Sequence, residues 1–155
     1  MTQNEFTFDV FIENEAGSMT KNTYNEETLA HLGARTVAAP YPFPYGFVRH
    51  TKSGDGDALD CFVVTQRPLS SGETVRCVAI HLLEQIEDGA RDHKILAIPT
   101  SDDGAHIDGD QVDAIRRFIM RVFSDVPGKR MELGGLLNAE AARQAIADAR
   151  LDGGA

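Results

Sequence analysis

The sequence predicts an α+β protein that is mainly β, in which a closed or nearly closed antiparallel sheet is followed by two helices. Short apolar runs fill the first hundred positions and are separated by turns rich in Gly, Pro and Ser. Helical periodicity of the apolar residues begins only after position 110. No repeat, low-complexity tract or linker divides the 155 residues, so one domain is expected over residues 1–155.

Five strands are expected in the first two thirds of the chain. The first covers residues 6–12, where alternation places four apolar side chains on one face: Phe6, Phe8, Val10 and Ile12. The segment 41–46 holds two prolines two positions apart, which forbid a helix and an inner strand and make it extended and rigid. The other strands are expected at 47–48, 58–64, 75–83 and 95–98.

Two amphipathic helices are expected in the C-terminal half. The first has five apolar residues on one helical face: Val112, Ile115, Phe118, Ile119 and Val122. The second begins after Asn138, a good N-cap residue, and directs a second apolar set inward: Ala142, Ala145, Ile146 and Ala149. Both helices therefore have a face that we expect to pack on the sheet.

The charge and the cysteines narrow the classes of partner and location. Fifteen Lys and Arg residues against 24 Asp and Glu residues give a formal net charge of −9, which argues against a nucleic-acid partner. No apolar run approaches the ~20 residues that a membrane span needs, and the first nine residues lack the basic residues of a signal or transit peptide. Cys61 and Cys77 lie inside apolar runs, without zinc spacing, which favours small core residues and a cytoplasmic location.

An acidic turn holds Asp55, Asp57 and Asp60 within six positions. The first two lie in a Gly-flanked turn, and Asp60 falls on the following strand, on the face opposite Leu59 and Cys61. Carboxylates this close repel one another unless a cation holds them, and Mg²⁺ prefers oxygen ligands. The turn therefore predicts a metal site, with a solvated acidic loop as the alternative.

A second acidic group, at 87–94, also lies in a loop that leads into a strand. Asp92 and Lys94 are two positions apart, so they share one face of an extended chain. This arrangement suits a metal ligand beside a phosphate-binding ammonium. The alternative is a surface ion pair worth about 0–1 kcal/mol.

Three segments together, in order and spacing, resemble the soluble inorganic pyrophosphatases of family I. Residues 55–60 resemble the signature Asp-x-Asp-(Pro/Glu)-φ-Asp, with Ala58 in place of Pro or Glu. Residues 41–47 resemble Tyr-Pro-x-Asn-Tyr-Gly, with Pro44 in place of Asn, and residues 92–94 resemble Asp-x-Lys. The resemblance covers roughly residues 12–150. It implies a closed five-stranded barrel of the oligonucleotide-binding kind and a homo-oligomer, which is a hexamer in typical bacterial members.

The resemblance also implies Mg²⁺-dependent hydrolysis of inorganic pyrophosphate to two phosphates, by direct attack of a metal-activated water. Mg²⁺ ions about 3.5–4 Å apart lower the pKa of a water and clamp the attacking and leaving oxygens. The implied metal ligands are Asp55, Asp60, Asp92, Glu87 and Glu13, with Asp88 as the alternative to Glu87. Asp57 is the implied general base. The implied substrate-binding residues are Lys21, Arg35, Tyr45 and Lys94.

Two departures from the family pattern leave other functions open. Thr23 stands where the family has a glutamate, and Val122 and Phe123 stand where it has a Tyr-Lys pair that grips a phosphate. Arg121 and Lys129 are the nearby basic residues that could replace this charge. The alternatives are hydrolysis of another diphosphate or of a phosphonate-type substrate, and a non-catalytic relative that binds metal and phosphate.

Overall fold

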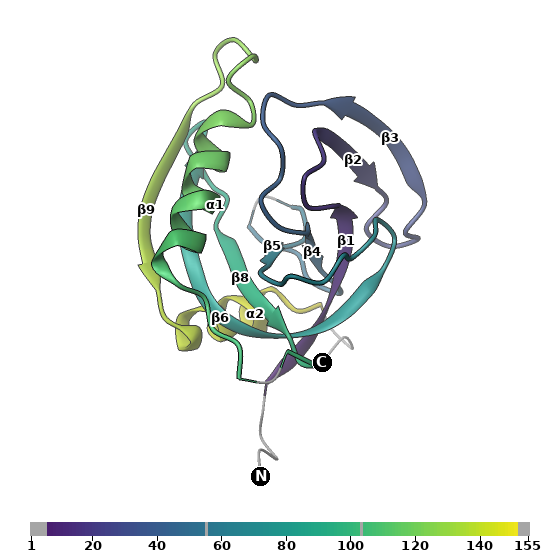
Figure 1. Ribbon diagram of the computed structural model, residues 1–155, viewed down its shortest axis with the longest axis vertical. Helices are drawn as coiled ribbons and strands as arrows, with labels where there is room; N and C mark the ends of the chain where they lie inside the picture. Colours follow the sequence, from purple (N-terminus) through teal and green to yellow (C-terminus); the bar gives the residue numbers. More distant parts are fainter. Residues whose placement is uncertain (1–5, 55, 103, 152–155) are drawn as a thin grey trace.

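A closed five-stranded barrel forms the centre of the computed structural model, which describes residues 6–54, 56–102 and 104–151 (Figure 1). Neighbouring strands follow the order β1-β4-β5-β8-β6, and β1 also pairs with β6, which closes the barrel. The barrel strands are β1 (Thr7–Asn14), β4 (Tyr45–Val48), β5 (Asp60–Val63), β6 (Thr74–Glu87) and β8 (Lys94–Pro99). The prediction of a closed barrel built from these five segments is confirmed.

One pairing in the barrel differs from the antiparallel sheet that was expected. β5 and β8 run parallel, with Asp60 opposite Lys94 and Cys61 opposite Ile95, whereas the other four pairs of the barrel are antiparallel. The long strand β6 separates β5 from β8 in the sequence but not in space. Because β8 turns back along β6 and then lies against β5, it runs in the same direction as β5.

Four further strands lie outside the barrel. β2 (Thr20–Tyr24) and β3 (His31–Thr36) form a separate two-stranded ribbon, which Figure 1 shows on the side of the molecule away from β9. β7 (Ala90–Arg91) and β9 (Met131–Leu137) both pair with β6. These four strands were not predicted from the sequence, because β3 is largely exposed, no residue of β9 is buried, and neither shows a clear apolar alternation.

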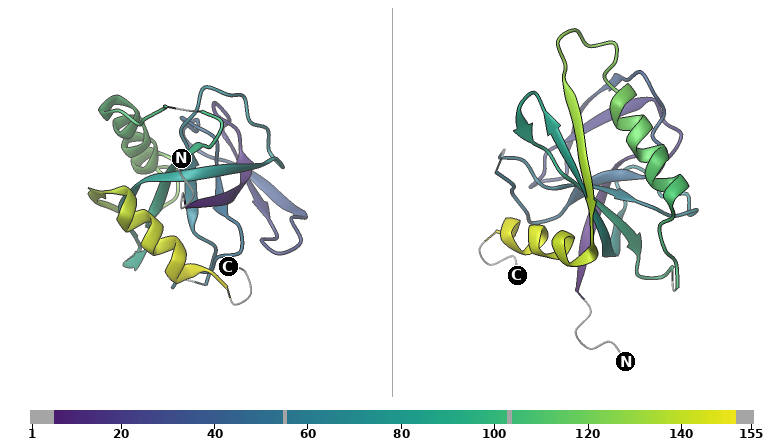
Figure 2. Two further views of the ribbon diagram at one scale, coloured as in Figure 1. Left: turned by 90° about the horizontal axis from the view of Figure 1, so that it is seen from below. Right: turned by 90° about the vertical axis from the view of Figure 1, so that its left-hand side faces the viewer.

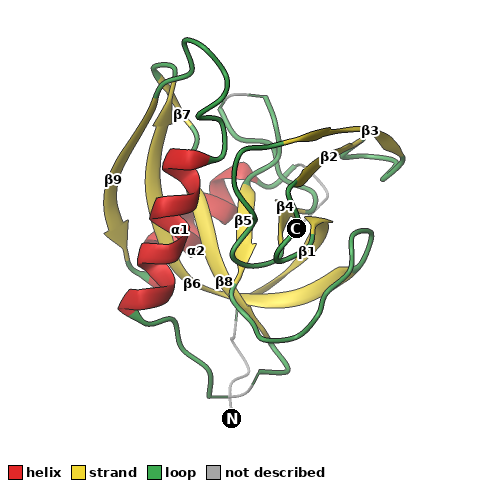
Figure 3. Cartoon of the chain, turned by 45° about the horizontal axis from the view of Figure 1, so that its top comes forward, coloured by secondary structure: helices red, strands yellow, loops and turns green. Residues whose placement is uncertain are grey.

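The two helices occupy the predicted positions and cover different parts of the sheet (Figures 2 and 3). α1 (Gly109–Arg121) begins with a capping box in which the Asp108 side chain accepts a hydrogen bond from the Gln111 backbone N–H. α2 (Ala139–Ala149) begins after Asn138, whose side chain accepts a hydrogen bond from the Ala141 N–H, so the predicted N-cap is confirmed. No helix among the described residues is long and apolar enough to span a bilayer.

The strands β5 and β8 contribute to two core clusters, one on each face. Cys61 and Ile95 belong to the cluster that packs under α2, whereas Phe62 and Leu96 belong to the cluster that packs under α1. This two-sided burial explains why both strands are continuous apolar runs. Cys61 and Cys77 are free and buried, as predicted. The face under α1 also carries Asp60 and Lys94, in alternation with the buried residues, and so leads into the site described next.

Candidate active site

Nine of the ten residues predicted for the site line one cavity of about 570 Å³. These nine are Glu13, Lys21, Arg35, Tyr45, Asp57, Asp60, Glu87, Asp92 and Lys94. The tenth, Asp55, lies outside the described residues. The lining side chains come from all nine strands and from α1, so the cavity exists only in the folded chain.

Lys94 occupies the centre of the acidic part of the cavity. Its Nζ atom lies 2.6 Å from Asp60 Oδ2 and 3.0 Å from Asp92 Oδ2, and the residue is only 5% exposed. Asp60 is brought there by the parallel pairing of β5 with β8, which sets it directly opposite Lys94. The aromatic ring of Tyr45 lies 5.7 Å from Nζ on another side. The ammonium therefore neutralises two carboxylates, one from β5 and one from the turn that leads into β8.

The carboxylates nearest Lys94 differ in how their environment affects them. Burial disfavours the charged form of Asp60, but the adjacent Lys94 ammonium overcomes this effect and lowers the pKa of Asp60. Burial, together with the nearby Asp60 charge, raises the pKa of Asp92 to about 7 although Lys94 opposes the shift. The pKa of Lys94 is raised despite its burial, because both carboxylates favour the ammonium. The three groups thus hold more negative charge than one lysine balances.

Glu13 adds a further carboxylate from β1. Burial and then the Asp60 charge raise the pKa of Glu13 to about 8, and Lys21 acts in the opposite direction. The pKa of Tyr45 is raised well above its usual value by burial and by the same acidic groups, so its phenol stays a hydrogen-bond donor. Repulsion among these carboxylates is what a bound cation would relieve.

Lys21 and Arg35 reach the cavity from the β2–β3 ribbon. They are direct cross-strand partners, so their side chains project from the same face of the ribbon. The ribbon is attached to the barrel through Asn14, whose buried Oδ1 accepts hydrogen bonds from the backbone N–H and the side-chain amide of Asn22. Two cations therefore face the acidic groups of the barrel across the cavity.

Asp57 lies at the rim of the cavity and is exposed. The turn that carries it is attached to the β2–β3 connection, because the Ala58 backbone N–H donates a 3.0 Å hydrogen bond to Glu26 Oε1. Glu26, which is not among the residues predicted for the site, also lines the cavity. No pattern links Glu26 to a turn 32 residues further along, so only the fold could reveal this contact.

A second cluster surrounds Glu87, at the end of β6. Lys129 Nζ lies 2.6 Å from Glu87 Oε2, and the same ammonium lies 5.0 Å from the centre of the Phe123 ring. The guanidinium of Arg35 lies 5.0 Å from the same ring. Lys129 lines the cavity, whereas Arg121 is exposed and is not among the lining residues. Of the two basic residues considered as replacements for the absent lysine, only Lys129 is therefore at the site.

The donor set suits a hard divalent cation, because the acidic residues offer only oxygen ligands. Among the described residues, which omit Asp55, no three Asp, Glu, His or Cys side chains are gathered closely enough to hold a metal as they stand. Lys94 holds Asp60 and Asp92, and Lys129 holds Glu87. A divalent cation would take over the charge compensation that these two lysines provide.

Comparisons with known proteins identify the family. The sequence model described as inorganic pyrophosphatase matches residues 10–152. The inorganic pyrophosphatase of Halalkalibacterium halodurans is 31% identical over 147 residues, covering 89% of this chain and 90% of that protein. This chain belongs to the inorganic pyrophosphatase family. The inorganic pyrophosphatase of Thermoplasma volcanium is 32% identical over 156 residues, covering 94% of this chain and 92% of that protein.

Solved structures of inorganic pyrophosphatases share the fold. The structure from Coxiella burnetii superposes with a TM-score of 0.84 at 29% identity, covering 92% of each chain. The structure from Helicobacter pylori gives a TM-score of 0.84 at 26% identity, covering 92% of this chain and 91% of that one. The departures of this pyrophosphatase family member also lie at its cavity, since Thr23, Val122 and Phe123 all line it.

Proposed function

We propose that this chain hydrolyses inorganic pyrophosphate to two phosphates with Mg²⁺ as the metal, by direct attack of water. The observation that carries the proposal is the convergence of carboxylates and cations from seven of the nine described strands on one cavity. Carboxylates suit divalent cations, and cations suit the phosphate groups of an anionic substrate. Each class of group is required for hydrolysis of a highly charged anhydride in water.

Asp60, Asp92, Glu87 and Glu13 are the described residues that would hold the metal, and Asp55 joins them by its place in the sequence signature. Bound divalent cations supply Lewis acidity and lower the pKa of a coordinated water. The raised pKa values of Glu13 and Asp92 support this assignment, because crowded carboxylates bind a cation with relief of repulsion.

Asp57 is the proposed general base. It lies at the rim of the cavity, where its carboxylate can accept a proton from the attacking water. Its exposure keeps the carboxylate in contact with solvent, which can take the proton away after each cycle. Glu26 supports this role by holding the adjoining backbone at Ala58.

Lys21, Arg35, Tyr45 and Lys94 are the proposed phosphate-binding residues. Lys21 and Arg35 project together from the ribbon, and Lys94 lines the same cavity from β8. Their positive charges offset the charge that moves onto the leaving phosphate, and the Tyr45 hydroxyl donates a hydrogen bond. The two lysines and the arginine thus bind substrate and stabilise the transition state.

The test is phosphate release from pyrophosphate by the purified protein in Mg²⁺, with Asp57→Asn as the variant. Loss of the base is expected to reduce kcat by on the order of 10²–10⁴. Asp148→Asn is the matched control, because Asp148 is exposed on α2 and is not among the residues that line the cavity. Wild-type phosphate release by Asp57→Asn would refute the role of Asp57.

A second candidate is hydrolysis of another diphosphate or of a phosphonate-type compound. It is favoured by the apolar part of the cavity wall, which Val122, Phe123 and Met131 form together with α1. Phosphate release from a panel of organic diphosphates, measured beside pyrophosphate, separates the two candidates. Binding of pyrophosphate without turnover in the same panel would instead identify a non-catalytic relative.

We also propose a cytoplasmic location and a homo-oligomer, a hexamer by resemblance. Two free, buried cysteines suit a reducing compartment. Sedimentation velocity of the purified protein measures the assembly state directly.

A further inference from the structure

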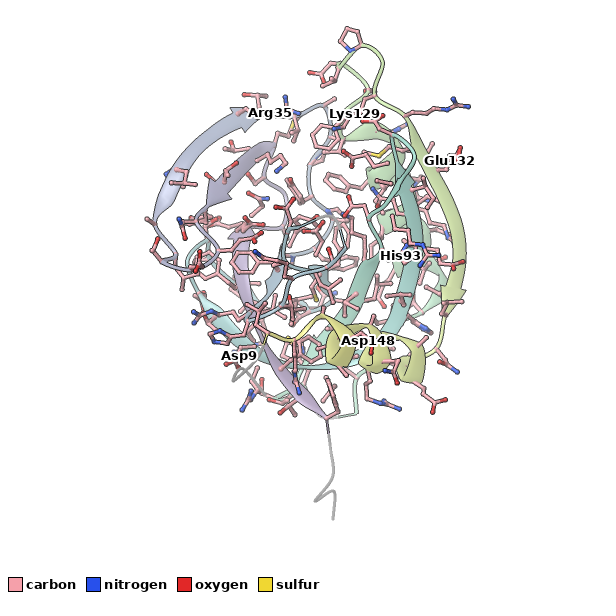
Figure 4. All side chains as sticks on the ribbon, turned by 180° about the vertical axis from the view of Figure 1, so that it is seen from behind. Asp9, Arg35, His93, Lys129, Glu132 and Asp148 are labelled. Carbon is pink, nitrogen blue, oxygen red and sulfur yellow. The ribbon has the colours of Figure 1, made fainter. Side chains whose placement is uncertain are left out.

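The Phe123 ring contacts two cations of the cavity. Arg35 and Lys129 each place their charged group 5.0 Å from the ring centre. Figure 4 shows both residues at the same end of the molecule, which is remote from Asp148 on α2. An aromatic face attracts cations, so the ring offsets part of the repulsion between two like charges. A guanidinium and an ammonium held this way offer a paired site for an anion.

The Lys129 ammonium has Glu87 as a second partner. Its Nζ atom lies 2.6 Å from Glu87 Oε2, and the two side chains are 26% and 24% exposed. Asp88 Oδ2 is at 4.0 Å, which is the limit for an ion pair. Glu87 is therefore the main ion-pair partner of Lys129, and solvent reaches the pair.

The Glu87 carboxylate cannot bind a divalent cation and keep its full attraction for the Lys129 ammonium. A cation on the Glu87 carboxylate would neutralise its charge and would also repel the ammonium. Lys129 would then leave Glu87 while its ammonium stays over the Phe123 ring. The released ammonium could then bind an anion held near Arg35.

We propose that Lys129 is a substrate-binding residue that metal binding releases. In the metal-free protein Lys129 holds Glu87, and in the metal-loaded protein it contacts a phosphate of the substrate beside Arg35. Phe123 is the positioning residue that keeps the two cations on one anion. This inference rests on the proposed function, because it takes a phosphate-containing substrate and a divalent cation at Glu87.

The proposal predicts opposite effects of one substitution on two ligands. Lys129→Met keeps an unbranched side chain but removes the charge. Metal binding without substrate is expected to become about 2- to 5-fold tighter, because Lys129 no longer competes for Glu87. Binding of imidodiphosphate, a slowly hydrolysed pyrophosphate analogue, is expected to weaken by roughly 10-fold or more in saturating Mg²⁺. A merely structural role would not move the two affinities in opposite directions.

The measurements are titration calorimetry of Mn²⁺ into the substrate-free protein and of imidodiphosphate into the Mg²⁺-loaded protein. Lys129→Arg is expected to restore most of the analogue affinity, and Phe123→Leu to give an intermediate loss. Arg130→Ala is the matched control, since Arg130 is the exposed neighbour, is not a lining residue, and makes its hydrogen bonds with Asp88 through its backbone N–H and carbonyl, which the substitution keeps. Steady-state kinetics should show the Lys129→Met defect mainly in KM.

The outcomes separate this proposal from the function on which it rests. If the wild-type protein binds neither Mn²⁺ nor imidodiphosphate, the proposed function fails. If the wild-type protein binds both, and Lys129→Met binds the analogue equally well or binds the metal more weakly, the role of Lys129 is overturned. Should Lys129→Met fail to fold, Lys129→Gln and Phe123→Leu put the same pair of affinities to the test.

Discussion

Lys94 lies directly opposite Asp60 because β5 and β8 pair in parallel, and the ammonium and the carboxylate are 2.6 Å apart. Asp92, two residues before Lys94, contacts the same ammonium from the turn that leads into β8. The single parallel pair of the barrel therefore joins the two acidic segments of the sequence. This pairing brings the acidic residues of the two segments into one cavity.

Removal of the Lys94 charge is expected to destabilise the metal-free protein. Lys94→Ala leaves the partly buried carboxylates of Asp60 and Asp92 without their cation, at a cost of about 3–5 kcal/mol in the free energy of unfolding. Urea unfolding in EDTA measures the loss, and Mg²⁺ is expected to restore part of it. Unchanged stability of Lys94→Ala in EDTA would show that the ammonium does not balance these carboxylates.

The metal-free protein is expected to lose stability as the pH rises through neutrality. Burial and Asp60 raise the pKa of Glu13 to about 8 from 4.5, so the folded state keeps a proton that the unfolded chain releases. Since the unfolded chain binds fewer protons over this window, the free energy of unfolding falls between about pH 4.5 and pH 8. Urea unfolding in EDTA across this window should give a flatter profile for Glu13→Gln. An equal slope in the two proteins would contradict the assignment.

Glu26 is expected to position the turn that carries Asp57. Glu26→Ala removes the acceptor of the Ala58 N–H, and the resulting displacement of the turn should lower kcat by roughly 10- to 100-fold. Glu26→Gln keeps an oxygen at the same place and is expected to retain much more of the activity. The kcat values of both variants in Mg²⁺ provide the measurement, and equal losses in the two would argue for a role of the charge instead.

Gly46 is required by the close approach of β4 to β1. A Cβ atom at this position would collide with the backbone carbonyl of Phe11, and neither strand can move without breaking the barrel. Gly46→Ala is therefore expected to cost several kcal/mol, on the order of the largest effects of single substitutions. Thermal unfolding compares it with Gly33→Ala on β3, where a Cβ meets nothing within 4 Å. Similar melting temperatures for the two variants would contradict this explanation.

The sequence was sufficient for the parts of the fold that depend on local patterns. Alternation identified β1, continuous apolar runs identified β5 and β8, and a good N-cap at Asn138 identified the start of α2. The acidic turn and the 87–94 segment likewise contain most of the candidate metal ligands, because ligands of one site often lie close together in a turn.

Other features depend on contacts between distant segments and could not be predicted. The parallel pairing of β5 with β8 follows from the path of β6, which extends further than its apolar run indicated and carries Gln85 and Glu87 into the cavity. The Glu26 contact with Ala58 spans 32 residues. The sequence left Arg121 and Lys129 as equal candidates to replace the absent lysine, and only the fold places Lys129 beside Glu87.

The central claim is that side chains from separate strands bind divalent cations that make water reactive toward pyrophosphate. The most direct measurement is colorimetric phosphate release from pyrophosphate by the purified wild-type protein, in Mg²⁺ and in Mg²⁺ with excess EDTA. The account predicts two phosphates per pyrophosphate in Mg²⁺ and no release above background in EDTA. Absence of release in Mg²⁺, or equal release in both conditions, would contradict it.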